Sequence, residues 1–344
     1  MRRLRAGSDG EGLGVKASVL VTGGAGYVGS HACKALSQAG YLPIAYDSLE
    51  RGHHWAVRWG PLEVGWLHDR RRLDEVLLKY KPTAALHFAA YAYVGESAAD
   101  PGRYYWNNVA GSVSLLEALR HANVTKLVFS STCATFGIPD IVPITEDCPQ
   151  RPINAYGASK LMVERMLADY DQVYGMRSVS LRYFNAAGAD PEAEIGEAHD
   201  PETHLIPLAL LAAMGRMPSV TVFGSDYPTA DGTCVRDYVH VADLADAHVL
   251  ALKYLDGGGS TCCLNLGTGK GWSVAEVIKS AMDVTGRPIA VVNGQRRAGD
   301  PPALVADATR AMQVLGWAPK FPHIRQQVDH AWRWLLRGSA GSPS

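Results

Sequence analysis

The chain has 344 residues, of which 47% are apolar, so it is long enough for about two domains with well-filled cores. Its 33 Lys and Arg residues are balanced by 34 Asp and Glu residues, and the net charge of −1 provides no broad attraction to a polyanion. This balance argues against a nucleic-acid-binding protein. Anionic ligands are instead expected to be held by a few arginines and by backbone amides.

Targeting and redox features favour a soluble, cytoplasmic protein with no membrane partner. The basic residues 1–5 run into Gly and Ser, and no later apolar run approaches the roughly 18 residues of a membrane span. The glycine-rich residues 1–16 are expected to form a mobile tail. The six cysteines include no CxxC pair and no Cys/His cluster with zinc-ligand spacing, so we expect reduced thiols and no metal site.

Short β-branched runs alternate with longer amphipathic segments from Ser18 onward. The run SVLV precedes a helix expected over residues 26–40, and LPIAYD, AALHFAA, KLVFSS and RSVSLRYFNAAG are expected to be further strands. Strands that alternate with helices predict an α/β fold, a Rossmann-like doubly wound parallel sheet with helices on both faces.

The pattern loosens after about Gly188, where loops rich in Pro, Gly, Asp and Glu surround helices expected near residues 242–255 and 273–285. We therefore expect a Rossmann domain over residues 17–188. A smaller C-terminal α/β substrate domain is expected over residues 189–340, with residues 235–267 returning to the first domain.

A GxxGxxG segment, formed by Gly23, Gly26 and Gly29, joins the first strand to the first helix. These glycines let the backbone turn tightly and approach a pyrophosphate, which then lies against the free amides of a helix start. An ordinary glycine turn also matches this motif. However, Asp47 closes the second strand 18 residues after Gly29, close to the roughly 20-residue offset of an acid that binds ribose hydroxyls. Since a carboxylate there repels the extra phosphate of NADP, the segment predicts an NAD site.

Hydroxyl side chains end the KLVFSS strand at Ser130, Ser131 and Thr132, where a parallel strand delivers its last residues to the ligand crevice. Tyr156 and Lys160 follow in YGASK, and their four-residue separation places the phenol and the ammonium on one helix face. YxxxK alone is common and uninformative. Downstream of this strand end in a dinucleotide-binding fold, it predicts a catalytic pair.

Proton transfer by Tyr156 requires ionisation near neutrality of a group whose pKa is about 10, a change of roughly three units or about 4 kcal/mol. One neighbouring cation supplies about one to three units. We therefore expect Lys160 alone to be marginal, and the positive nicotinamide ring of the oxidised cofactor to supply the remainder.

The chain resembles the extended short-chain dehydrogenase/reductases, and more narrowly the UDP-glucose (UDP-galactose) 4-epimerases of the subset found in bacterial exopolysaccharide pathways. The resemblance covers residues 17–334 and is carried by VTGGAGYVGSH, HFAAYAYVGES, NNVAG, FSSTCATFG, INAYGASKLMVE, LRYFNAAGADP, HLIPL, DYPTADGTCVRDYVHVADLADAH and RRAGDPP. It implies an isomerase that keeps its NAD. Tyr156 takes the proton of the sugar 4-hydroxyl while hydride passes from carbon 4 to nicotinamide. The 4-keto sugar then swings about its pyrophosphate link, and hydride returns to the other face.

The resemblance also implies the residues of each subsite. Thr132 stands where the family hydrogen-bonds the 4-oxygen, and Lys160 where it holds the nicotinamide ribose. The cofactor residues, with those of the glycine motif, are Gly23, Gly26, Tyr27, Val28, Gly29, Asp47, Ser48, Leu67, Phe88, Ala89, Ala90, Asn107, Ser130, Tyr156, Lys160 and Tyr183. The substrate residues are Thr132, Tyr156, Asn185, His204, Leu205, Phe223, Arg236, Arg297, Asp300 and Leu304. Among these, the two arginines match diphosphate ligands, and Asp300 matches the uridine-ribose acid.

Several positions depart from the family pattern. Trp66 stands where relatives usually carry an Asp that binds the adenine amino group, and a tryptophan stacks on adenine but cannot accept that bond. Ser48 replaces a frequent Asn, and Ala92 stands where some relatives have Lys. Leu304 is smaller than the Tyr of strict glucose/galactose enzymes, which predicts some turnover of UDP-N-acetylglucosamine.

The same residues distinguish between this activity and several alternatives. A 4,6-dehydratase is disfavoured because Cys133 and Ala134, rather than an Asp-Glu pair, follow Thr132. Epimerases of UDP-N-acetylglucosamine or of UDP-xylose and UDP-arabinose remain open, as does a dehydrogenase that exchanges NADH at each turnover. An inactive NAD-binding regulator is disfavoured by the presence of Tyr156, Lys160 and Thr132.

The resemblance implies a homodimer in which each subunit contributes two helices to a four-helix bundle. The stretch of residues 104–121 offers a matching apolar stripe in Val109, Val113 and Leu116.

Overall fold

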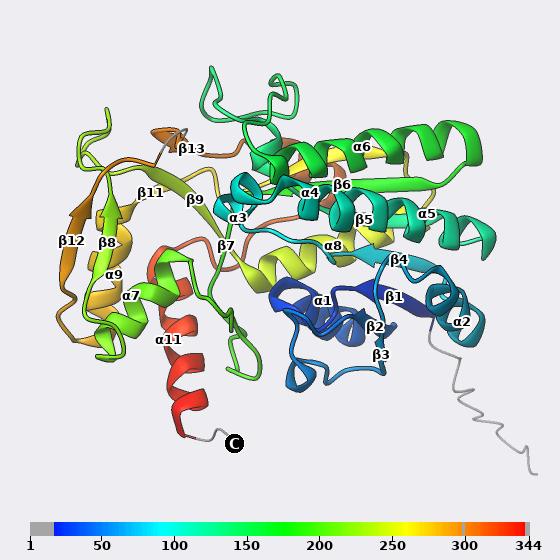
Figure 1. Cartoon of the computed structure of the whole chain (residues 1–344), viewed down its shortest axis with the longest axis horizontal. Coiled ribbons are helices and arrows are strands. Elements are labelled where there is room, and N and C mark those ends of the chain that lie inside the picture. Colours follow the sequence, from blue (N-terminus) through cyan, green and yellow to red (C-terminus); the bar gives the residue numbers. More distant parts are fainter. Residues whose placement is uncertain (1–16, 298–299, 341–344) are drawn as a thin grey trace, which may run out of the picture.

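A seven-stranded parallel sheet, with the strand order β10-β6-β5-β4-β1-β2-β3, forms the centre of the molecule (Figure 1). The computed structural model describes residues 17–297 and 300–340, so the expected tail at residues 1–16 lies outside the described residues. The strands of this sheet are β1 (Ser18–Thr22), β2 (Leu42–Asp47), β3 (Leu62–Val64), β4 (Ala84–His87), β5 (Lys126–Thr132), β6 (Arg177–Tyr183) and β10 (Cys262–Leu266). The order reverses between β1 and β4, which places a ligand crevice at their carboxyl ends. The predicted Rossmann-like doubly wound fold is confirmed.

Helices cover both faces of this sheet (Figure 1). On one face lie α1 (Tyr27–Gln38) and α8 (Val241–Asp256), and on the other lie α2 (Arg70–Tyr80), α5 (Gly111–His121) and α6 (Ala155–Tyr174). Successive strand residues point to opposite faces. Val19 and Val21 therefore join the core beneath α1 and α8, whereas Leu20 joins the core beneath the other three helices.

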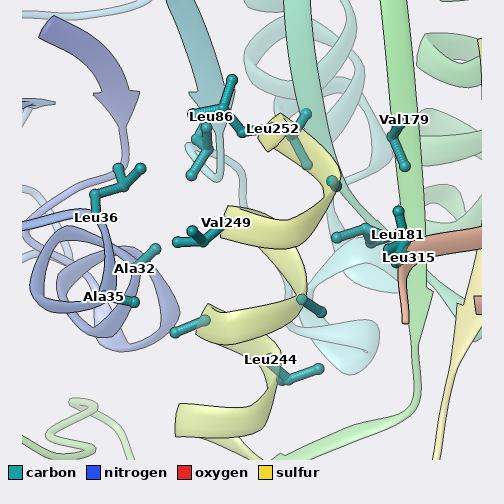
Figure 2. Close-up of a cluster of buried hydrophobic side chains, with 14 of the residues drawn as sticks. Ala32, Ala35, Leu36, Leu86, Val179, Leu181, Leu244, Val249, Leu252 and Leu315 are labelled. Atoms are coloured by element: carbon teal, nitrogen blue, oxygen red, sulfur yellow. The ribbon is translucent and has the colours of Figure 1, made fainter. Parts of the chain in front are cut away.

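The contact between α1 and α8 shows how the sequence closes this core (Figure 2). Ala32 and Ala35 are small residues on α1 that face Val249 of α8, and Leu36 and Leu252 fill the space toward the sheet. All five side chains are buried. The close approach of these two helices fixes the position of the first turn of α1, which borders the crevice.

A smaller part of the molecule is built around two minor sheets. Its four-stranded sheet contains β7 (Asn185–Ala187), β9 (Val235–His240), β11 (Gly271–Ser273) and β13 (Ala303–Leu304), and its two-stranded sheet pairs β8 (Val220–Phe223) with β12 (Val291–Gly294). The helices α7 (Leu205–Ala213), α9 (Val274–Thr285) and α11 (Ile324–Ala340) pack on them around a separate apolar core.

The segment 235–267, which we expected to return to the first domain, is divided between the two parts. β9 pairs with β7, β11 and β13 of the smaller part, while α8 packs on α1 and β10 pairs with β6 of the large sheet. The return therefore begins at Val241 rather than at residue 235, because long-range strand pairing holds β9 in the minor sheet.

Short helical segments connect these elements: η1 (His54–Ala56), α3 (Val94–Ala99), α4 (Pro101–Tyr104), the π-helical turn η2 (Tyr105–Ala110), η3 (Cys133–Thr135) and α10 (Thr309–Leu315). Within residues 17–297 and 300–340, no helix combines the length and apolarity needed to cross a bilayer. All six cysteines lie in the described part of the chain, and each is a free thiol.

Candidate active site

The turn between β1 and α1 has room for glycine alone at two positions. Gly23 has a φ of +73°, and a Cβ there would lie 2.6 Å from the amide nitrogen of Ala89, just after β4. A Cβ at Gly29 would overlap the carbonyl oxygen of Gly23. After Gly26, α1 begins without a side-chain cap, so the amides of its first turn are available to an anion. This cradle fits the pyrophosphate of a dinucleotide.

Asp47 lies beside this turn at the end of β2. One of its carboxylate oxygens accepts a hydrogen bond from the Ala25 amide at 3.0 Å, and the other accepts one from the Leu49 amide at 2.9 Å. Burial raises the pKa of Asp47 above the usual value of an aspartate, and these two amide bonds oppose the rise. The carboxylate is thus fixed next to the predicted ribose site.

The substitution Asp47→Asn is expected to weaken NAD binding by about 10- to 100-fold, because hydrogen bonds to a charged group contribute roughly 1.5–3 kcal/mol. The preference for NAD over NADP should fall as well, since the repulsive charge is gone. Titration of cofactor-stripped protein with each nucleotide measures both effects, with Asp74→Asn, which changes an exposed carboxylate of α2, as the matched control. An unchanged ratio of the two affinities would remove Asp47 from cofactor selection.

Lys160 and Tyr156 lie in the first two turns of α6, whose start is capped by Asn154. Lys160 is 3% exposed, and its ammonium donates a hydrogen bond of 2.8 Å to the Ser130 carbonyl oxygen. Burial lowers the pKa of Lys160 to about 7. The lysine therefore joins the start of α6 to the carboxyl end of β5.

The Tyr156 phenol faces Thr132, the last residue of β5. Burial raises the pKa of Tyr156 above its ordinary value, and the hydrogen bond with Thr132 opposes that rise. The enclosure thus adds to the cost of forming a phenolate and also disfavours the charged form of Lys160. The expected contribution of an oxidised nicotinamide to the ionisation of Tyr156 stays a prediction.

The remaining predicted cofactor residues border the same crevice. The Tyr183 hydroxyl lies 2.6 Å from the Ser130 hydroxyl at the ends of β6 and β5. Phe88, Ala89 and Ala90 follow β4, and all three are partly exposed. The crevice is therefore lined by the ends of β4, β5 and β6 as well as by the glycine turn.

The two asparagines of NNVAG have different roles. Asn108 is buried, accepts a hydrogen bond from the Tyr91 amide, and donates to the Tyr91 carbonyl and to the Ser159 hydroxyl. Asn107, the predicted cofactor residue, is partly exposed and donates to the Asn108 side chain. Asn108 was not singled out from the sequence, yet it ties the loop after β4 to the helix that carries Tyr156.

Leu67 and Trp66, at the predicted adenine end, differ in exposure. Leu67 is buried, whereas Trp66 is 40% exposed and stacks on His68 with a centroid separation of 5.6 Å. The Trp66 carbonyl accepts a hydrogen bond from the buried Tyr46 hydroxyl. A flat apolar surface thus stands where the family has a hydrogen-bonding acid.

Arg236 and Asp300, predicted for the diphosphate and the uridine ribose, form an ion pair of 2.8 Å. Arg236 also donates to the carbonyls of Val235 and Pro301, so it is held in place. Leu304 pairs with Arg236 in the register of β13 and β9. These residues gather at one edge of the minor sheet.

A second predicted arginine lies near this edge. Arg297 lies over the Phe223 ring, with 3.9 Å between the guanidinium carbon and the ring centroid. Asn185, in β7, lies in the strand that pairs with β9. The predicted sugar-nucleotide residues thus extend from the crevice to the minor sheets, and their contacts with substrate stay predictions.

His204 and Leu205 lie at the start of α7. The Nδ1 atom of His204 is 2.6 Å from Glu197 and 3.2 Å from Glu202, and His199 completes this group of four. The pattern Glu-x-His-x-x-Glu-x-His over residues 197–204 contains no cysteine, and it was not predicted from the sequence as a metal site. The density of potential ligands in this short segment is the signal that identifies it.

Comparison with known proteins agrees with this geometry. The model of the NAD dependent epimerase/dehydratase family matches residues 19–267. A UDP-glucose 4-epimerase of Rhizobium leguminosarum bv. trifolii is 55% identical over 322 residues, which cover 94% of this chain and 98% of that protein.

Two solved structures are also similar to the chain. The UDP-glucose 4-epimerase from Brucella ovis in complex with NAD is 52% identical with a TM-score of 0.90, over 92% of this chain and 98% of that one. A UDP-glucose-4-epimerase from Stenotrophomonas maltophila with bound NAD and formylated UDP-arabinopyranose is 39% identical with a TM-score of 0.91, over 95% of this chain and 100% of that one. These matches confirm the resemblance inferred from the sequence, and the chain belongs to the NAD dependent epimerase/dehydratase family, together with the UDP-glucose 4-epimerases.

Proposed function

We propose that the protein is a UDP-glucose 4-epimerase, an isomerase that interconverts UDP-glucose and UDP-galactose by inverting carbon 4. The observation that carries this proposal is that α6 places Tyr156 against Thr132, and Lys160 against the Ser130 carbonyl, at the carboxyl end of β5. The 55% identity to a UDP-glucose 4-epimerase over nearly the whole chain supports the same activity.

NAD, when bound, supplies the acceptor and donor of the hydride at carbon 4. Tyr156 as the phenolate accepts the proton of the sugar 4-hydroxyl when hydride leaves carbon 4, and as the phenol it returns that proton when hydride comes back. The Thr132 hydroxyl hydrogen-bonds the 4-oxygen and orients it. Lys160 is held by the Ser130 carbonyl, and in its charged form it favours ionisation of the phenol on the same helix. A positioned acid–base group of this kind contributes roughly 10²–10⁴-fold in rate.

The residues after Thr132 argue against elimination of water from the sugar. Cys133 is buried, and burial raises the pKa of its thiol to about 12. Ala134 has no ionisable group. Because neither side chain can act as a carboxylic acid there, the site supports epimerisation rather than dehydration.

The test is to incubate the purified protein with UDP-galactose, without added cofactor, and to follow the configuration at carbon 4. We expect conversion to UDP-glucose with no accumulation of free NADH. Conversion that consumes added NAD and releases NADH in proportion to the product indicates a dehydrogenase. NAD binding without any conversion indicates a regulator.

The range of sugars is a finer proposal. The bound formylated UDP-arabinopyranose of the Stenotrophomonas relative keeps a pentose substrate open for this chain, and the partly exposed Leu304 leaves more room than the tyrosine of strict hexose enzymes. Separate incubations with UDP-N-acetylgalactosamine and UDP-arabinose test these alternatives.

We expect the wild-type protein to turn over some UDP-N-acetylglucosamine. The substitution Leu304→Tyr is expected to lower that activity at least about 10-fold, because an added ring clashes with the acetamido group, while UDP-galactose conversion stays within about 2-fold. Initial rates with both sugars provide the measurement. No turnover of the acetylated sugar by a wild-type protein that converts UDP-galactose would contradict the prediction.

We also propose a cytoplasmic homodimer that serves exopolysaccharide synthesis. Of the predicted stripe, Leu116 is buried in the core of its own subunit and is unavailable to a partner, whereas Val113 is 39% exposed. Exposed Trp106 of η2 and Met162 of α6 add apolar surface on the neighbouring segments. These exposed side chains support a dimer surface that differs in detail from the expected stripe.

A further inference from the structure

Four side chains with metal-binding atoms converge in the loop between β7 and α7. Glu197, His199, Glu202 and His204 each offer one ligand atom, and these atoms all lie within 4.8 Å of one another. We propose that this Glu/His cluster binds one Zn²⁺ ion. The cluster includes His204, for which the resemblance implies a substrate contact, and the proposed role of the ion is to hold the structure of the loop.

The distances between the ligand atoms fit a four-coordinate ion. Zn–N and Zn–O bonds of about 2.0–2.2 Å in a tetrahedron place neighbouring ligand atoms about 3.3–3.6 Å apart. A Glu197 oxygen lies 2.9 Å from Nδ1 of His199 and 2.6 Å from Nδ1 of His204. Glu202 lies 3.2 Å from Nδ1 of His204 and 4.0 Å from Nδ1 of His199. Both histidines thus direct the same ring atom toward both carboxylates, and shifts of under about 1 Å in these four pairs create the coordination shell.

The charge of the cluster calls for a divalent cation. The Glu197 side chain is only 7% exposed and that of Glu202 is 12% exposed, and two enclosed carboxylates are costly unless they are compensated. A divalent ion with two neutral imidazoles balances both carboxylates.

Backbone contacts hold the ligands in place. One Glu202 oxygen accepts hydrogen bonds from the amides of Thr203 at 2.7 Å and His204 at 2.8 Å. The Trp334 indole donates to the Glu197 carbonyl at 3.0 Å. Ligands that are fixed by surrounding contacts lose little entropy when an ion binds.

The ligand types favour zinc over the hard cations. Two imidazole nitrogens and two carboxylate oxygens suit Zn²⁺, whereas Mg²⁺ and Ca²⁺ prefer six or more oxygen ligands. Four protein ligands leave no open position for a reacting water, which is the arrangement of a structural site.

The position of the cluster indicates what the ion stabilises. The His199 ring meets the Tyr27 ring edge-on with 6.2 Å between centroids, and Tyr27 directly follows Gly26 of the cofactor turn. The Tyr27 hydroxyl donates to the Gly188 carbonyl at 2.6 Å. An ion at the cluster therefore fixes the loop against the turn that is expected to hold the cofactor pyrophosphate.

The first experiment uses the whole protein, purified without chelators or a polyhistidine tag. We expect elemental analysis to find about one zinc per chain, and calorimetric titration of chelator-treated protein with ZnCl₂ to recover the same ratio. Co²⁺ in place of zinc should give the intense visible absorption of tetrahedral coordination. Wild-type protein that holds no zinc and gains no thermal stability from ZnCl₂ would overturn the proposal, as would a preference for Mn²⁺ or Mg²⁺.

The second experiment locates the site. The substitutions Glu202→Gln and His199→Gln introduce side chains close in size to the native ones. We expect each to weaken Zn²⁺ binding by more than about 100-fold, since loss of a group that only hydrogen-bonds a ligand already lowers metal affinity by about 10- to 100-fold. His121→Ala, which removes an exposed histidine of α5, is the control and should bind zinc normally. Metal-free unfolding temperatures of all variants report whether they fold. Undiminished zinc binding by both Gln variants would place any bound zinc elsewhere.

Discussion

Replacing Tyr156 by phenylalanine is expected to reduce the rate of carbon 4 inversion by at least about 10²–10⁴-fold, the contribution of a positioned acid–base group. α6 places the phenol against Thr132 at the end of β5, where we propose that it exchanges a proton with the sugar 4-oxygen, whereas the Lys160 ammonium donates to the Ser130 carbonyl. Affinity for NAD should change little, because the glycine cradle and Asp47 remain intact. Steady-state kinetics with UDP-galactose and cofactor titration measure the two effects.

The matched control is Tyr170→Phe on the same helix. Its hydroxyl donates a hydrogen bond to Glu117 far from the crevice, so its loss should leave the isomerisation rate within about 2-fold of wild type. If Tyr156→Phe instead turned over at the wild-type rate while Tyr170→Phe behaved as expected, the proposed acid–base role would be wrong. Titration of the Tyr156 phenol with oxidised and with reduced cofactor then tests the charge argument. Equal pKa values in the two states would exclude the nicotinamide charge as a cause.

The substitution Arg182→Met is expected to destabilise the fold by about 3–5 kcal/mol, because it leaves the buried Glu164 without its cationic partner. Arg182 donates to both Glu164 oxygens, at 2.9 Å and 2.7 Å, and both side chains are under 10% exposed. Ser131 and Gln150 also donate to Glu164. This network fixes α6 against β5 and β6, one helical turn beyond Lys160. Urea unfolding monitored by circular dichroism measures the loss.

The double variant Glu164→Gln, Arg182→Met provides the rescue. With the uncompensated charge removed, we expect it to recover more than half of the stability lost by Arg182→Met alone. A single variant that unfolds at the wild-type urea concentration would show that solvent reaches Glu164. A double variant less stable than the single one would show that the pair acts through packing rather than charge.

The large sheet and the glycine turn could be predicted from the sequence because they depend on residues that are close together in the chain. Val19 and Val21 face one core and Leu20 faces the other, as expected for a strand whose side chains alternate between the two faces of a sheet. The lack of room for a side chain at Gly23 and Gly29 arises within the turn itself and from the residues just after β4. The spacing of Tyr156 and Lys160 is likewise a property of one helix.

Features that depend on distant partners were not predictable in this way. The ion pair of Arg236 with Asp300 joins residues 64 positions apart, and the place of β9 in the minor sheet depends on its pairing with β7 and β13. The choice between Asn107 and Asn108 depends on the π-helical turn that contains them, which directs one side chain inward and leaves the other partly exposed. The Glu/His cluster was not predicted because its four ligand atoms come together only through the fold of a loop that contains no cysteine.

The burial of Cys133 has a consequence for how the protein withstands oxidants. Thiols react with peroxide and with alkylating reagents such as iodoacetamide as thiolates, so a thiol whose pKa is raised to about 12 reacts very slowly at neutral pH. Cys133 adjoins Thr132, and its oxidation to a bulkier acid would distort the residue that orients the sugar. Because burial keeps the Cys133 thiol protonated, oxidants and alkylating reagents should modify it slowly. Catalysis should therefore persist through treatments that inactivate enzymes with an accessible cysteine at the reaction centre.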